Sequence, residues 1–259
     1  KFILARPMKT AGLSFETAVS NYCSYGDIIT AANRDEDWIR QQLKARRHRN
    51  DRTPVSNTRI RPHMPLKRLF RNSKLVPGQT PDKGFASEYT PDINAAMRTY
   101  QIVSMTRNPW EKIRSLYYHH LRFMKADERS VSFKNWCNTV NPLVNSGDED
   151  GAGIQTTLDY YLLRDFRVLN KFHSRVDFWI RFHYMKQDII NFERHYKMDG
   201  LWKTFDSYRF HVWNTHKRGV PLKTWYENRD ATFAAEKIRT TYQWEIKKFG
   251  YKYLDTPGW

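Results

Sequence analysis

The first segment of the chain that could do chemistry is a short loop with a lysine, a glycine and two hydroxyl groups. Residues 6–14 read Arg-Pro-Met-Lys-Thr-Ala-Gly-Leu-Ser, directly after the apolar residues 2–5. If a strand precedes this loop and a helix follows it, backbone N–H groups at the helix start converge on one point, which suits a phosphate or sulfate. Lys9 adds a compact positive charge, and Thr10 and Ser14 add hydroxyl donors. The loop is therefore a candidate anion site.

The order of residues in this loop differs from the phosphate loop of nucleotide triphosphatases. That pattern has glycine well before a lysine at the start of the helix. Here Lys9 comes before Gly12. The order disfavours a nucleotide kinase or ATPase, and a plain strand-to-helix turn remains an alternative because motifs this short arise by chance.

A second candidate anion site follows another apolar run, residues 100–105. Residues 104–118 read Ser-Met-Thr-Arg-Asn-Pro-Trp-Glu-Lys-Ile-Arg-Ser-Leu-Tyr-Tyr, and Pro109 suits the first turn of a helix. Arg107 falls at the carboxyl end of the expected strand, where open parallel sheets bind ligands. Its guanidinium can form two hydrogen bonds to a phosphate, and Ser115, about two turns along the helix, can add a hydroxyl. The alternative is that Arg107 pairs with a carboxylate.

The elements that must position these two loops alternate between strand and helix. Apolar runs predict strands at residues 2–5, 27–32, 100–105 and 176–181. Helical spacing of apolar residues predicts helices at 14–22, 35–44, 110–124, 132–138, 156–163, 186–196 and 231–249. The order predicts one α/β domain over residues 1–259, with a central parallel sheet flanked by helices on both faces. Residues 141–153 are expected to form a surface loop.

The charge of the chain indicates an anionic partner. There are 44 Lys and Arg against 27 Asp and Glu, a formal net charge of +17, and residues 40–74 hold twelve basic residues and one acid. Charge attracts phosphate, sulfate or nucleic acid alike, and the basic segment could also be a solvated face. A nucleic-acid-binding protein therefore remains an alternative, although it gives no reason for two anion loops that each follow a strand.

Other classes of protein are disfavoured by composition. With 40% hydrophobic residues the chain can bury a core, and no apolar run approaches the roughly 20 residues that span a bilayer. The histidines and cysteines lack metal-site spacing, and Cys23 and Cys137 are expected to be buried thiols. Because residues 2–5 already indicate a strand, we expect the natural N-terminus to lie further upstream, with any signal or anchor there.

In its two motifs the chain resembles the sulfotransferases that use 3′-phosphoadenosine 5′-phosphosulfate (PAPS), especially the carbohydrate branch. That family has a strand followed by a Pro-Lys-Thr-(Ala or Gly)-Gly-Thr-Ser loop around the 5′-phosphosulfate, and a later Arg-(Asp or Asn)-Pro signature with a following Ser that holds the 3′-phosphate. The matching residues are Lys9, Thr10, Ala11, Gly12 and Ser14 in the first motif, and Arg107, Asn108, Pro109 and Ser115 in the second. Residues 176–182, 188–189, 238–242 and 249–251 also resemble the family, so the likeness spans nearly the whole chain.

The resemblance implies a sulfotransferase domain related to nucleotide kinases, which moves a sulfuryl group from PAPS to an acceptor hydroxyl and releases 3′-phosphoadenosine 5′-phosphate (PAP). It implies a carbohydrate acceptor, with a small molecule or natural product as the alternative, and neither a metal nor a nucleic-acid partner. Lys9 would stabilise charge on the bridging oxygen. Arg107 and Ser115 would hold the 3′-phosphate. The 5′ end would be held by Lys9, Thr10, Ala11, Gly12, Leu13 and Ser14.

Some positions depart from the family pattern or leave a choice open. Met8 replaces a usual Pro and Leu13 a usual Thr, so one hydroxyl donor is missing. The family carries a His or Glu between the motifs as the base that deprotonates the acceptor. Here the base is His63 or, if the family's histidine position falls on Gly84, Glu88. A reference pKa near 6.5 favours the imidazole.

Two further sets of residues are placed by the same resemblance. Residues 214–219 occupy the place of a loop that closes over the 3′-phosphate end of the nucleotide. Lys217 or Arg218 could contact that phosphate, or the loop could be a solvated basic one. His119 and His120 are expected to be packing or acceptor-side residues, since adjacent helical positions face different directions.

Overall fold

The computed structural model describes residues 2–23, 41, 100–140, 156–209 and 220–253. They form an α/β structure with a three-stranded parallel sheet flanked by helices. They divide into two compact units, the first within 1–106 and 168–214 and the second within 107–167 and 215–259. Apart from residue 41, four predicted features lie outside the described residues: the strand at 27–32, the helix at 35–44, the basic segment 40–74 and the loop 141–153.

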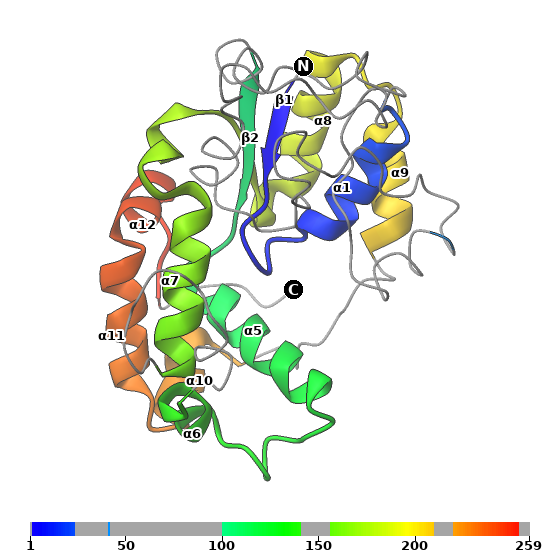
Figure 1. Ribbon diagram of the computed structural model, residues 1–259. Coiled ribbons are helices and arrows are strands. Elements are labelled where there is room, and N and C mark those ends of the chain that lie inside the picture. Colours follow the sequence, from blue (N-terminus) through cyan, green and yellow to red (C-terminus); the bar gives the residue numbers. More distant parts are fainter. Residues whose placement is uncertain (1, 24–40, 42–99, 141–155, 210–219, 254–259) are drawn as a thin grey trace, which may run out of the picture. The chain divides into compact units, whose positions relative to one another are not determined.

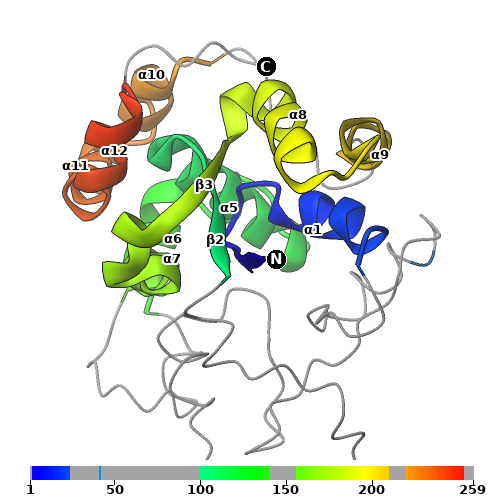
Figure 2. The ribbon, with the colours of Figure 1, turned by 90° about the horizontal axis from the view of Figure 1, so that it is seen from above.

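The first unit is built on the sheet. It contains β1 (Phe2–Ala5), β2 (Gln101–Thr106) and β3 (Val176–Arg181), in the order β1-β2-β3 with both pairs parallel (Figures 1 and 2). Ala5 lies beside Ser104, whose hydroxyl donates to the Ala5 carbonyl at 3.1 Å. The strands predicted at 2–5 and 176–181 are confirmed to the residue, and the one at 100–105 is displaced by one residue.

Helices cover one face of this sheet. α1 (Gly12–Ser20), α8 (Met185–Tyr196) and α9 (Leu201–Arg209) lie together on that face (Figure 2). Side chains alternate between the two faces of a strand, so Val103 and Met105 pack under these helices while Ile102 packs on the opposite face. There it packs with the last two residues of α7 (Thr157–Leu169), so apolar side chains are buried on this face of the sheet as well.

The second unit is helical, with an aromatic core. It contains α5 (Pro109–Phe123), α6 (Phe133–Asn138), most of α7, α10 (Leu222–Glu227), α11 (Thr232–Thr241) and α12 (Gln243–Phe249) (Figure 1). Tyr117, Trp136 and Tyr226 are among the buried residues that these helices share. The single helix predicted at 231–249 is wrong, because the chain breaks at Tyr242 into α11 and α12. The sequence analysis also missed α9 and α10.

The cysteines differ from each other in burial. Cys137 is a fully buried thiol, and burial raises its pKa, which suits a structural side chain. Cys23 is only half-buried, contrary to the expectation that both thiols are buried, because it follows the last turn of α1. No helix among the described residues is both long and apolar enough to cross a membrane.

Candidate functional site

The loop between β1 and α1 passes through two residues in the left-handed region. Lys9 has a φ of 58° and Ala11 a φ of 65°, a conformation that costs a residue with a side chain about 1 to 2 kcal/mol. Between them Thr10 is fully buried, and its hydroxyl donates to the Pro7 carbonyl at 2.9 Å. The Thr10 hydroxyl therefore closes the turn, whereas the sequence analysis expected it to donate to a ligand. Strain of this kind is typical of loops whose shape serves binding.

The helix that follows starts without a side-chain cap. Its N-cap residue is Ala11, whose methyl group cannot accept a hydrogen bond, and its first turn holds no acidic residue. The N–H groups of Gly12, Leu13 and Ser14 therefore lack an intrahelical acceptor and lie at the positive end of the helix dipole. Leu13 supplies its N–H as well as the family's threonine would. An oxyanion at this helix start would satisfy donors for which the described residues provide no acceptor.

A serine hydroxyl lies in the same turn. Ser14 is 3% exposed, and its hydroxyl has no hydrogen-bond partner among the described residues. Ser20, near the other end of α1, donates to the Thr17 carbonyl at 2.7 Å. The two serines differ because a hydroxyl near a helix C-terminus can reach a carbonyl of its own helix, while one in the first turn has fewer such acceptors.

An ion pair made by Arg6 connects the start of the loop to α1. The buried guanidinium of Arg6 pairs with Glu16 on the second turn of α1. On its way the side chain passes so close to Gly12 that a Cβ there would lie 2.2 Å from the Arg6 Cγ. Gly12 was expected to matter for the nucleotide, and the structure adds a packing reason for glycine. The sequence analysis missed the Arg6–Glu16 pair, since no spacing rule predicts a contact between residues ten positions apart across a loop.

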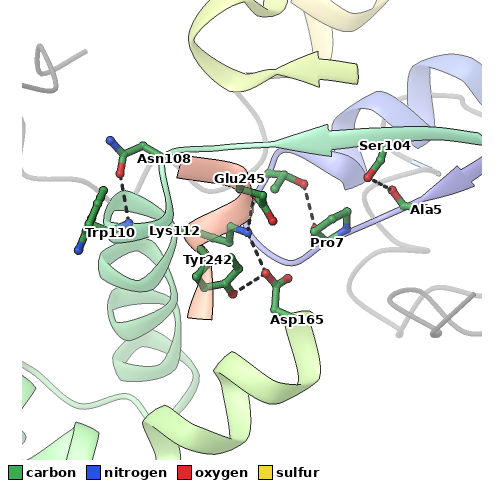
Figure 3. A network of polar contacts seen from close by, with 10 residues as sticks. Ala5, Pro7, Ser104, Asn108, Trp110, Lys112, Asp165, Tyr242 and Glu245 are labelled. Atoms are coloured by element: carbon green, nitrogen blue, oxygen red, sulfur yellow. Dashed lines mark hydrogen bonds and ion pairs between the residues drawn. The ribbon is translucent and has the colours of Figure 1, made fainter. Parts of the chain in front are cut away.

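The second motif starts α5 at a defined residue. The Asn108 side chain accepts a hydrogen bond from the backbone N–H of Trp110 at 3.1 Å (Figure 3). Its amide group donates to the Lys252 carbonyl at 2.9 Å. Pro109 occupies the first helical turn, as predicted. The asparagine of the motif thus caps the helix, and this fixes the positions of the residues that follow it.

Glu111 and Ser115 are four residues apart and so share one side of α5, while Arg107 lies just before the N-cap residue of this helix. The Nε of Arg107 contacts the Glu111 Oε2 at 3.3 Å, and both side chains are buried. Burial lowers the pKa of Arg107 and the Glu111 carboxylate acts against that shift, so the guanidinium stays charged. Arg107 does pair with a carboxylate, the alternative considered above, and the printed contact is made through Nε and not through the two terminal nitrogens of the guanidinium. Ser115 is buried without a partner among the described residues.

Two other cations of this motif belong to the core of the second unit. The Lys112 ammonium lies 2.8 Å from Asp165 and 3.7 Å from Glu245, and the Tyr242 hydroxyl also donates to Asp165 (Figure 3). Burial alone would lower the pKa of Lys112, but the two carboxylates outweigh it and the pKa is raised. Arg114 donates to the Val220 carbonyl at 3.0 Å. Both side chains therefore have structural roles.

The remaining predicted site residues have mixed outcomes. The Nδ1 of His120 accepts a hydrogen bond from the Trp136 indole at 2.5 Å, and burial lowers its pKa, which supports a packing role. Within the described part of the chain there is no group of three or more His, Cys, Asp or Glu that could hold a metal. Four candidates lie outside the described residues: His63, Glu88, Lys217 and Arg218.

Comparison with known proteins adds no relative. No family model, curated protein or solved structure matches this chain.

Proposed function

We propose that this protein is a sulfotransferase that moves a sulfuryl group from PAPS to an acceptor hydroxyl, with a carbohydrate as the acceptor class. The observation that carries the proposal is the uncapped start of α1, which directly follows a strand and a lysine-containing loop. Its N–H groups and the Ser14 hydroxyl form a set of donors without an acceptor of their own among the described residues. A phosphosulfate has the charge and the oxygens to satisfy them.

Lys9 is the residue that we expect to act on the reaction itself. The acceptor oxygen attacks sulfur, the bond between sulfur and the bridging phosphate oxygen breaks, and the bridging oxygen leaves with the electron pair as part of PAP. An ammonium beside that oxygen stabilises the charge that it gains, which is electrostatic catalysis without a metal. Lys9 is half-buried, so its charge is less screened than that of a fully exposed lysine.

The second motif would bind the other end of the nucleotide. Arg107 contacts Glu111, and Ser115 follows Glu111 on the same side of α5. A guanidinium together with a hydroxyl donor is a common way to hold a phosphate. Lys112 takes no part in this proposal, because its ammonium already contacts Asp165.

The proton of the acceptor hydroxyl must go to a base, for which His63 and Glu88 are the candidates from the sequence. If His63 is the base, turnover rises with pH through the pKa of an imidazole, and His63→Ala removes that limb of the profile. A silent His63→Ala together with an inactive Glu88→Gln assigns the role to the carboxylate.

The proposal is tested by incubating the protein with PAPS and a panel of unsulfated polysaccharides and small alcohols. We expect PAP to form only when an acceptor is present. Mass spectrometry should show an equal amount of a product that is heavier than the acceptor by the mass of one SO₃ group, about 80 Da. ATP in place of PAPS should give no phosphorylated product. Phosphoryl transfer from ATP, or no reaction with PAPS and no binding of PAP, would overturn the proposal.

A further inference from the structure

The pair formed by Arg107 and Glu111 is the feature that the proposed function does not yet explain. The two side chains are 7% and 3% exposed, and the Arg107 Nε lies 3.3 Å from the Glu111 Oε2. Taking two charges out of water is costly, and a buried ion pair often adds no more stability than apolar residues of the same size. A contribution to folding is therefore a weak reason for this pair.

The two partners differ in how firmly the backbone holds them. Glu111 lies in the first turn of α5, whose start is fixed by Pro109 and by the cap from Asn108. Arg107 lies before the helix and carries a long side chain with several rotatable bonds. The contact thus attaches the guanidinium of a long side chain to a helix turn whose backbone is fixed.

Arg107 contacts Glu111 through Nε, and this choice of atom matters for phosphate binding. A guanidinium has one N–H at Nε and four more on its two terminal nitrogens, and the terminal pair forms the fork that fits a phosphate. Glu111 contacts Arg107 at Nε. A carboxylate at that atom fixes the plane of the group and leaves the geometry of the fork intact.

The neighbouring charges make a partner of this kind necessary. Burial is the main reason why the pKa of Arg107 is lowered, and the nearby charge of the buried Arg114 lowers it further. Glu111 balances that repulsion. Lys112 and Arg114 have partners on other segments, Asp165 and the Val220 carbonyl, whereas the carboxylate that holds Arg107 belongs to the motif itself.

We propose that Glu111 is a positioning residue that orients Arg107 toward the 3′-phosphate of the donor nucleotide. The inference rests on the proposed function. Holding the guanidinium in its bound conformation before the nucleotide arrives reduces the entropy lost on binding. Glu111 therefore acts on the part of the affinity that comes from the 3′-phosphate and on no other part.

The experiment compares PAP with adenosine 5′-phosphate, which lacks only the 3′-phosphate, by calorimetry on the whole chain. In the wild type the ratio of the two affinities measures what the 3′-phosphate contributes. Glu111→Gln should lower that ratio about tenfold, since a charge-assisted contact becomes a neutral one, while the affinity for adenosine 5′-phosphate stays within about twofold. With PAPS and an acceptor, KM for PAPS should rise while kcat is kept.

Three further variants separate positioning from general damage. Glu128 is a glutamate of the same unit that contacts an arginine, Arg229, and is less buried than Glu111. Glu128→Gln breaks this contact and should leave the ratio unchanged. Glu111→Asp withdraws the carboxylate by one methylene and should lower the ratio in the same direction, which covers the case in which Glu111→Gln does not fold. In an Arg107→Ala background, Glu111→Gln should have no further effect on the ratio.

The outcomes distinguish this inference from the proposed function. A wild type that binds both nucleotides equally overturns the proposed function, and the role of Glu111 with it. A wild type that prefers PAP, together with Glu111→Gln or Glu111→Asp variants that keep the full preference, overturns the role of Glu111 alone. An added effect of Glu111→Gln in the Arg107→Ala background shows that Glu111 does not act through Arg107.

Discussion

The side chain of Arg6 passes directly over the α-carbon of Gly12 before it reaches Glu16. A Cβ at Gly12 would lie 2.2 Å from the Arg6 Cγ and 2.7 Å from its Cδ, so the arginine can take this path only where residue 12 has no side chain. The glycine of the loop thus permits the ion pair that holds the loop to α1.

Gly12→Ala should destabilise the protein by about 1 to 3 kcal/mol, the usual range for overpacking a buried site. The added methyl group displaces the Arg6 side chain and separates it from Glu16. The free energy of unfolding in urea measures the loss. Arg6→Ala in the same chain removes the clash, so the two changes together should cost less than the sum of their separate effects. Strict additivity would contradict the packing that we describe.

Lys9→Ala should lower turnover by about a hundredfold or more while changing PAP affinity far less, since the ammonium acts mainly when the bridging oxygen gains charge. Steady-state kinetics and calorimetry give the two quantities. Lys197 is the matched control, because it is a lysine of the same unit with a similar φ of 53° and an exposed side chain.

Lys197→Ala should leave turnover unchanged, which separates the lost charge from the backbone effect. Lys9→Arg should restore activity only in part, because the guanidinium is larger and differently hydrated. A Lys9→Ala protein with wild-type turnover would remove Lys9 from the mechanism.

Ser14→Ala should weaken nucleotide binding and Ser20→Ala should lower stability, although both serines are buried in α1. The Ser14 hydroxyl has no partner among the described residues, so its loss should not lower the free energy of unfolding but should weaken PAP binding by about 1 kcal/mol. Ser20→Ala loses the bond to Thr17 and should cost about 1 kcal/mol of stability with no change in binding. Thermal unfolding with and without PAP distinguishes the two patterns, and a Ser14→Ala protein that binds PAP as the wild type does would exclude a role for the hydroxyl.

Lys112→Met should destabilise the protein by about 3 to 5 kcal/mol, because it leaves Asp165 buried without its cation. Lys112→Met with Asp165→Leu removes both charges and should recover much of that loss. Lys134 pairs with Asp230 at the surface, and Lys134→Met should cost less than about 1 kcal/mol. Urea unfolding of the three variants decides whether Lys112 has a structural role, and equal losses for Lys112→Met and Lys134→Met would refute it.

The same contacts predict how stability depends on pH. The pKa of Lys112 is raised in the folded state above the 10.5 of an ordinary lysine, so its contribution is complete below about pH 10.5 and is lost as the pH rises through the folded-state pKa. Burial also raises the pKa of Tyr242 well above 10.0, and the loss of stability at alkaline pH has the same sign. In urea unfolding, the wild type should therefore lose stability above about pH 10 more steeply than the variant that carries both Lys112→Met and Asp165→Leu.

The sequence predicted the strands best, because their signals are local. β1 and β3 are short apolar runs with charged residues at their ends, and Pro109 marks the start of α5 within a residue. The break at Tyr242 has no such signal, since neither glycine nor proline stands there. The Tyr242 hydroxyl contacts Asp165, which lies 77 residues earlier, so this boundary depends on tertiary structure.

In the candidate site, residue types were predictable and partners were not. The ion pair of Arg107 and Glu111 could have been predicted from the sequence, because the two residues are four positions apart. Lys112 lies in the second motif, and only the fold shows that its ammonium is buried against Asp165 in the core of the second unit. The left-handed backbone conformation of Lys9 and Ala11 could not be predicted from the sequence either, because neither residue is a glycine.

The central claim is that this chain binds a nucleotide through both of its phosphate-bearing ends. The most direct measurement is calorimetric titration of the unmodified protein with PAP and, separately, with adenosine 5′-phosphate. The account predicts that both bind and that PAP binds at least about tenfold more tightly, since a charge-assisted contact to the 3′-phosphate contributes about 1.5 to 3 kcal/mol. Equal affinities for the two nucleotides, or no heat with either at millimolar concentration, would contradict it.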